Sequence, residues 1–175
     1  MAKKTISFGL NDKDIARAIR EVEKFKQDFR NKVDTYRKRI AEEIAVQASH
    51  NFANSLVDDI IKGGSPHRPN VQVSVSDKGS ISVVVANGED AVWCEFGAGV
   101  YHNGAAGSSP HPKGSELGFT IGNYGKGYGK GQAWGYYDES GEIVITRGTE
   151  ATMPMYNAAQ EVMRKAVEIA KEVFG

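Results

Sequence analysis

The fold of this protein is decided by residues 10–62, which read LNDKDIARAIREVEKFKQDFRNKVDTYRKRIAEEIAVQASHNFANSLVDDIIK. This stretch contains neither glycine nor proline, and its apolar residues recur at steps of three and four from Ile15 to Ile60. Such spacing lines one face of an α-helix with apolar side chains. Asn11 or Asp12 is suited to cap its first turn. We therefore expect a helix over residues 12–61, ended by the Gly-Gly-Ser-Pro sequence at 63–66.

The length of this helix constrains how it packs. A helix over residues 12–61 would be about 75 Å long, whereas a compact domain of this size has a radius of gyration of about 16 Å. It therefore either breaks near residues 31–35 to form a helix pair, or extends so that its first half packs on another molecule. The apolar stripe widens from Ile40 onward, so we expect the second half to be the buried one. Polar residues on heptad seam positions counted from Ile15 disfavour an ordinary coiled-coil dimer; they are Lys32, Arg39 and Glu43.

Strand patterns surround this helix. Residues 3–9 are expected to form a short strand that ends at Gly9. Residues 71–76 alternate apolar and polar side chains, a turn follows at 77–80, and residues 81–85 return as the second strand of a hairpin. A third strand is expected over residues 91–96, and a later hairpin pairs residues 133–137 with 142–146. Residues 153–174 close the chain as a helix with Pro154 in its first turn, and one face of it carries Val162, Ala166, Ile169 and Val173.

Glycine is concentrated in one segment, where it supplies 11 of the 35 residues from Gly97 to Gly131. A loop of this length inside a compact domain favours a contact with a partner, and we expect deletion of residues 104–130 to leave the fold intact.

Together the patterns predict an α+β fold: a long N-terminal helix or helix pair, an antiparallel β-sheet with a long Gly-rich loop, and a C-terminal helix. We expect a single domain over residues 1–175, with a helical front (1–62), strands (63–96), the Gly-rich loop (97–131), a hairpin (132–147) and a C-terminal helix (150–175).

Composition narrows the classes of function. The 22 basic and 22 acidic side chains give a formal net charge of zero, which disfavours binding of nucleic acid through bulk positive charge. Residues 1–40 nevertheless carry a net charge of +6 and residues 41–99 a net charge of −5, so one copy could attract another. Cys94 is the only cysteine, which excludes an internal disulfide and favours synthesis in a reducing compartment. No apolar run approaches the roughly 18 residues of a membrane span, so no membrane partner is expected.

The motifs that would indicate catalysis, metal binding or phosphate binding are weak in this sequence. In the glycine segment a phosphate-binding loop ending at Gly129-Lys130 would need a glycine at Tyr124, and Gly131 occupies its Ser/Thr position. A metal site would have to be assembled from His102, His111 and Cys94, which lack the spacing of a metal-binding motif. We therefore predict no catalytic, metal or cofactor site and no enzymatic activity.

Two alternatives of another class stay open. A nucleic-acid-binding module would use the glycine segment, with bases stacking on its aromatic rings and its lysines on phosphate; the residues are Lys126, Tyr128, Lys130 and Trp134. A hydrolase would need a buried histidine or carboxylate beside Ser108 or Ser109.

Two segments together are more specific than any of these motifs. The first, residues 92–99, is Val-Trp-Cys-Glu-Phe-Gly-Ala-Gly, and the second, residues 151–159, is Ala-Thr-Met-Pro-Met-Tyr-Asn-Ala-Ala. With the helical front, the hairpin and the C-terminal helix, they resemble the neck proteins of tailed phages, the small head–tail connector and tail-completion proteins. The resemblance covers most of the chain after about Ile40. Pro154-Met155 stands where the family has a proline–aromatic pair.

This resemblance implies a structural virion protein that forms a ring in the neck and joins head to tail; a tail terminator or tail-completion protein is the alternative. The implied partners are other copies in the ring, portal-side connector and tail proteins, with non-specific DNA contact in the channel. The implied location is the virion, assembled in the host cytoplasm. The residues expected at interfaces are Glu95, Phe96, Gly97, Gly99, Tyr124, Tyr128, Trp134, Pro154 and Met155.

Overall fold

The computed structural model describes residues 5–57, 59–60, 67–97, 109–119, 134–137, 140–146 and 149–175. The elements, in chain order, are α1 (Asp12–Asn54), β1 (Asp59–Ile60), β2 (Gln72–Lys78), β3 (Ile81–Asn87), α2 (Asp90–Phe96), β4 (Trp134–Tyr137), β5 (Ile143–Thr146) and α3 (Pro154–Phe174). The protein has an α+β fold with a long N-terminal helix, antiparallel strands and a C-terminal helix.

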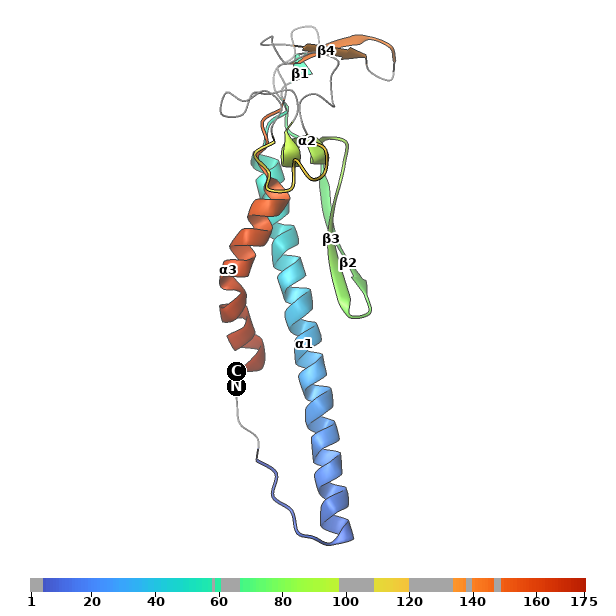
Figure 1. Ribbon diagram of the computed structural model, residues 1–175, viewed down its shortest axis with the longest axis vertical. Coiled ribbons are helices and arrows are strands. Elements are labelled where there is room, and N and C mark those ends of the chain that lie inside the picture. Colours follow the sequence, from blue (N-terminus) through green and yellow to red (C-terminus); the bar gives the residue numbers. More distant parts are fainter. Residues whose placement is uncertain are drawn as a thin grey trace.

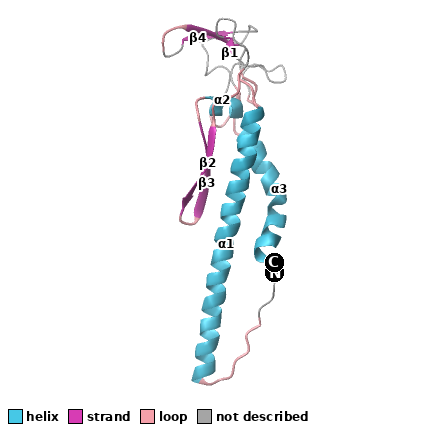
Figure 2. Cartoon of the chain, turned by 180° about the vertical axis from the view of Figure 1, so that it is seen from behind, coloured by secondary structure: helices cyan, strands magenta, loops and turns pink. Residues whose placement is uncertain are grey.

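Helix α1 is the spine of an elongated molecule (Figure 1). Helix α3 packs along one side of its upper half and the β2–β3 hairpin along another, and α2 lies near the upper end. A small antiparallel sheet with strand order β1-β5-β4 lies beyond that end. The view from behind shows the same arrangement, in which α3 ends near the middle of α1 and the hairpin ends above that point (Figure 2).

Helix α1 is one continuous helix of 43 residues, about 65 Å long. The expected cap is confirmed, because the Asn11 side chain accepts a hydrogen bond from the backbone N–H of Asp14 at 2.9 Å. Of the two arrangements left open, the projecting helix is the one observed, and there is no break at residues 31–35.

The predicted end of α1 was wrong, since the helix ends at Asn54 and not at residue 61. The next residue, Ser55, is extended, and its hydroxyl contacts both the carbonyl of Asn51 and, at 2.7 Å, the hydroxyl of Thr152. Two residues later, Val57 forms a β-bridge with His67. Contacts with distant segments therefore take the chain out of the helix before its helical pattern ends.

The hairpin prediction is confirmed. Strands β2 and β3 pair antiparallel with Lys78 opposite Ile81, so the turn between them consists of Gly79 and Ser80. Gly79 has φ +61°, a backbone conformation that favours glycine. The later hairpin is confirmed as well, since β4 pairs antiparallel with β5.

Two predicted strands are wrong. Residues 5–9, the described part of the strand predicted at 3–9, form no strand. Residues 90–96 form the short helix α2 and not a third strand. The helix buries Ala91, Cys94 and Glu95 together, which only a helical spacing of three and four places on one face.

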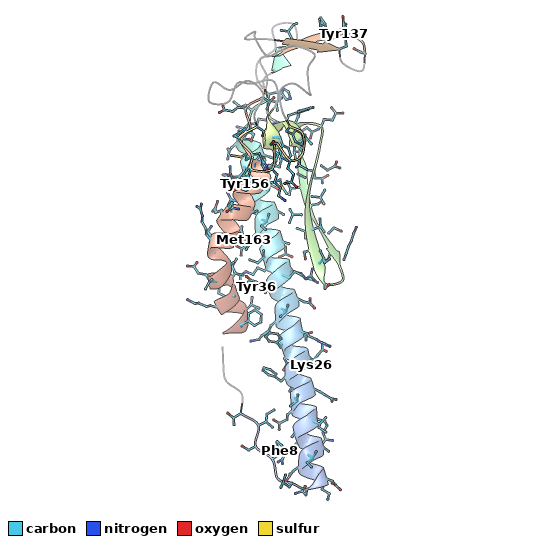
Figure 3. All side chains as sticks on the ribbon, viewed as in Figure 1. Phe8, Lys26, Tyr36, Tyr137, Tyr156 and Met163 are labelled. Atoms are coloured by element: carbon cyan, nitrogen blue, oxygen red, sulfur yellow. The ribbon has the colours of Figure 1, made fainter. Side chains whose placement is uncertain are left out.

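The C-terminal helix is confirmed, with Pro154 in its first turn. Its buried residues Ala158, Val162 and Ile169 lie on one face, and α3 packs extensively on α1. At its far end, the ring of Phe174 lies 5.8 Å from that of Phe29 and 6.1 Å from that of Tyr36. Figure 3 shows Tyr36 between the two helices near this end of α3.

The hydrophobic core is small and lies near the upper end of α1. It consists of Phe52, Val57, Ala91 and Cys94, with half-buried side chains from the hairpin and from Met155 packed against it. The prediction that the second half of α1 is the buried one is confirmed by Ala41, Ala48 and Phe52. The core therefore joins α1, α2, the hairpin and the start of α3.

Candidate functional site

Glu95 joins the two segments that carry the resemblance. Its carboxylate accepts hydrogen bonds from the backbone N–H of Met155 at 2.8 Å and of Tyr156 at 2.9 Å, in the first turn of α3. The residue before this helix, Met153, has a left-handed backbone with φ 51° and no capping side chain. A carboxylate is favourable at a helix N-terminus because it meets unpaired N–H groups and the positive end of the helix dipole. Glu95 thus supplies, from α2, the cap that α3 lacks locally.

The backbone just before α3 is held to α2 by further contacts. The carbonyl of Cys94 accepts hydrogen bonds from the N–H of Thr152 at 2.9 Å and of Met153 at 3.1 Å. Gly97 has φ 78°, and a Cβ there would lie 3.1 Å from the backbone nitrogen of Ala151. Glycine is therefore required both for the turn and for the close approach of the two segments.

Helix α1 holds the same turn from its other side. The Asn51 side chain donates a hydrogen bond to the carbonyl of Pro154 at 3.0 Å. Pro154 is fully buried, and Met155 packs on the core that contains Phe52. We call this meeting point of α1, α2 and α3 the motif junction; it comprises Asn51, Ser55, Cys94, Glu95, Gly97 and the turn at 151–156.

Part of the Gly-rich loop packs on the motif junction. The buried ring of His111 lies with its Nε2 3.3 Å from Oε1 of Glu95, and its Nδ1 accepts a hydrogen bond from the N–H of Lys113 at 3.0 Å. The ring of Phe96 stacks on Phe119 at 4.0 Å and lies 4.5 Å from His111. Residues 109–119 are therefore an integral part of the fold, and the expectation that residues 104–130 are dispensable needs correction.

The junction collects five of the residues predicted at interfaces, namely Glu95, Phe96, Gly97, Pro154 and Met155. Gly99, Tyr124 and Tyr128 lie outside the described residues, as does the side chain of Trp134, whose backbone begins β4. The five are largely buried within one chain, so they shape the fold and do not offer a free surface. The roles of Asn51, Ser55 and His111 were not predicted. No local pattern links Asn51 and Ser55 to partners about 100 positions away, or His111 to Glu95.

The arrangement gives no support to nucleophilic chemistry. The hydroxyl of Ser109 donates to the carbonyl of Phe96 at 2.5 Å, and the two ring nitrogens of His111 face Glu95 and Lys113. Ser108 and His102 lie outside the described residues. Within the described ranges, no group of three or more His, Cys, Asp or Glu side chains is placed to hold a metal ion. The residues of the nucleic-acid alternative, Lys126, Tyr128 and Lys130, also fall outside these ranges, together with the Trp134 side chain.

Cys94 is a buried thiol at the core of the junction. Burial, with the charges of Asp90 and Glu95 added, raises its pKa from 9.0 to about 12. At pH 8 the thiolate fraction is therefore roughly a thousandfold below that of an ordinary cysteine. We expect iodoacetamide to label the native protein far more slowly than the protein in concentrated guanidinium chloride, as measured by intact-mass spectrometry. Equal labelling rates in the two solvents would contradict the burial of this side chain.

The lower half of α1 differs from the upper half because most of its large apolar side chains are only partly covered. Six residues at helical spacing are between 39% and 53% exposed: Ile15, Ile19, Val22, Phe25, Phe29 and Val33. We call these six residues the α1 stripe. Below the end of α3, Figure 3 shows α1 accompanied, among the residues that the structure describes, only by the segment that carries Phe8. Of the surfaces described, this is the longest row of exposed apolar side chains on one helix.

The basic charge of the helical front is partly matched within the chain. Arg37 and Lys38 lie 2.9 and 3.6 Å from the carboxylate of Asp77 on the hairpin, and Arg39 lies 2.6 Å from Glu172 on α3. A hydrogen bond from Ser82, with the two cations, lowers the pKa of Asp77 below its usual value. These cations therefore have acidic partners in their own chain before any second copy is considered.

Among the described residues, no helix combines the length and the apolar character needed to cross a lipid bilayer. Comparisons of the chain with models of known protein families, with curated proteins and with solved structures found no match.

Proposed function

We propose that this protein is a non-enzymatic structural subunit that forms a ring in the neck of a tailed phage or phage-like particle and joins head to tail. The observation that carries the proposal is the motif junction. The two segments on which the resemblance rests lie about 60 residues apart, yet Glu95 of one caps the helix that begins in the other. A chance likeness of two short segments gives no reason for their residues to bind each other, whereas a shared structural plan does.

The shape of the chain supports a role in assembly. A helix of 43 residues on whose lower half no described helix or strand lies buries little by itself. Exposed apolar rows of this size are typical of surfaces that bind other proteins. Identical subunits form a ring when the contact between neighbours repeats around a rotation axis until it closes.

A tail terminator or tail-completion protein is the alternative position within the same class. Both positions imply contacts with other copies, with portal-side connector or tail proteins, and location in the virion. The two positions differ in whether the head or the tail retains the protein when head–tail joining is blocked. A neck connector is expected on isolated heads, and a tail terminator on isolated tails.

Disruption of the gene in the genome that encodes this protein tests the proposal. We expect lysates to contain separate filled heads and tails in negative-stain electron micrographs, and a plasmid copy to restore joined particles. Joined, infectious particles in the absence of the protein would overturn the proposal. Immunogold labelling of the protein, on heads and tails that stay separate because joining is blocked at another step while this protein is still made, then decides between the two positions.

The Gly-rich loop offers a sharper variant for the same assay. Residues 109–119 pack on the junction and must be kept, so we propose replacing only residues 121–130 with a Gly-Ser linker of equal length. We expect an unchanged thermal unfolding midpoint, measured by circular dichroism, and loss of head–tail joining. A variant that folds and still joins heads to tails would show that this segment is not the contact to a neighbouring ring.

A further inference from the structure

The α1 stripe ends where the covering of α1 by its own chain begins. The rings of Phe29 and Phe174 lie 5.8 Å apart, and Nζ of Lys32 lies 3.5 Å from the carbonyl of Phe174 near the end of the chain. Above this point α3 lies beside α1, and below it nothing in the described chain continues that packing. The stripe therefore extends an intramolecular helix–helix contact past the point where α3 ends.

We propose that residues 15–29 of α1 are the surface through which copies of this protein bind one another, side by side and parallel. The contact between copies does not depend on the proposed function. Only the ring that such contacts would build rests on it. The two heptads up to Phe29 carry apolar residues at every seam position, which are Ile15, Ala18, Val22, Phe25 and Phe29. Lys32 is the polar residue that interrupts the heptad pattern, and it lies where the packing of α3 on α1 begins.

The chain's own N-terminal segment leaves most of this surface open, although Ala18 within it is buried. Residues 5–10 run back beside the lower half of α1 in both views, yet the stripe stays 39–53% exposed in their presence. Phe8 and Leu10 are themselves 54% and 94% exposed, so they cover little of it. The occupant must therefore come from outside the described chain.

Charge favours a second copy of the same helix as that occupant. Residues 12–28 carry five basic and five acidic side chains, so two such segments do not repel each other overall. One flank of the seam is acidic at each heptad, with Asp14, Glu21 and Asp28, and the other flank carries Lys26. Parallel helices place Glu21 beside Lys26 of the next copy, whereas antiparallel helices would bring the acidic flanks together. Charge therefore selects the parallel orientation, which is also the orientation of helices related by a ring axis.

The size of the surface indicates that this contact acts together with others. The exposed part of the stripe amounts to roughly 500 Å², below the roughly 800 Å² per partner of a standard interface. Two heptads are also fewer than the three or four that identify a stable coiled coil. Such a contact suits a closed ring, where each copy has two neighbours and no single pair must hold alone.

Single-cysteine variants test the contact and its direction. Ile15→Cys and Phe29→Cys place thiols at opposite ends of the seam, and Gln27→Cys places one on the outer face as a control. Cys94 is buried and protonated, so the new thiol is the reactive one. With diamide as oxidant, we expect Ile15→Cys and Phe29→Cys each to form disulfide-linked dimers alone, in clear excess over Gln27→Cys. Cross-linking only in a mixture of the two variants, or no excess over the control, would overturn the proposal.

A charge placed on the seam gives an independent measurement. We expect Phe25→Glu to weaken self-association about tenfold or more in sedimentation velocity, and Gln27→Glu to leave it unchanged. Because the wild-type contact is apolar, it should persist at high salt, unlike one formed by the charge difference between front and body. Far-ultraviolet circular dichroism checks that both variants keep their helices, since both sites lie on an exposed part of α1.

The outcomes separate this inference from the proposed function. If Phe25→Glu still forms rings and joins heads to tails, the contact is wrong and the neck function stands. If the Ile15→Cys and Phe29→Cys variants cross-link through the seam while gene disruption leaves joining intact, the neck function is wrong and the contact stands.

Discussion

Replacing Glu95 with alanine is expected to lower the free energy of unfolding by about 3 kcal/mol. The substitution removes a buried carboxylate from two backbone N–H groups at the start of α3, where no local side chain can replace it. It also leaves the buried ring of His111 without its partner at 3.3 Å. Two half-buried backbone N–H groups and the buried His111 ring would each lose a polar partner, and the positive end of a 21-residue helix would lose its counter-charge.

Chemical denaturation followed by circular dichroism measures this loss. Glu95→Gln retains one acceptor oxygen but presents an amide N–H to a backbone donor, so we expect it to lie between alanine and wild type. Glu89→Ala is the matched control, because Glu89 precedes the same short helix, is exposed and makes no capping hydrogen bond. A Glu95→Ala variant as stable as the control would show that the carboxylate does not hold α3.

Replacing Phe52 with alanine is expected to cost about 4 kcal/mol of stability. Phe52 is 2% exposed and packs with Val57, Ala91 and Cys94, which are all smaller side chains. The other buried members of the cluster are too small to fill the cavity, and the half-buried side chains around it, such as Met155, could fill it only in part. Because the core also joins the hairpin and Met155 to α1, the substitution should destabilise the whole upper half of the molecule.

The thermal unfolding midpoint and the denaturant midpoint measure the effect of Phe52→Ala. Val46→Ala is the matched control on the same helix, because Val46 is 71% exposed and alanine is the better helix former. We expect the control to change stability by less than about 0.5 kcal/mol. Similar losses in the two variants would mean that the cluster around Phe52 is not the centre of the core.

The elements that the sequence predicted well are those with a long or regular local signal. The side chain of Asn11 and the repeat that follows it placed the start of α1 correctly. The alternation at 71–76 and the turn at 77–80 predicted the β2–β3 hairpin, and Pro154 marked the first turn of α3. In each case the residues that decide the structure are neighbours in the chain, so their pattern is visible without the fold.

The elements that failed depend on distant residues. The six residues Ala91–Phe96 fit either a strand or a helix, and only the burial of Ala91, Cys94 and Glu95 beneath their neighbours selects the helix. The helical pattern of α1 continues to about residue 61, but Ser55 and Val57 bind Thr152 and His67 instead. A local pattern cannot predict either outcome, because the competing contacts come from segments far along the chain.

The local order of residues alone determined that this protein has a helix longer than a compact domain of its size can cover, a hairpin and a C-terminal helix. Helical and strand periodicity are properties of neighbouring side chains, so they can be read without the fold. Only the tertiary structure decided where α1 stops, that Glu95 caps α3, and which part of α1 lacks a cover. The reason is physical: a cap, a helix end and an uncovered stripe depend on which surfaces meet, and here those surfaces lie 60 to 145 residues apart in the chain.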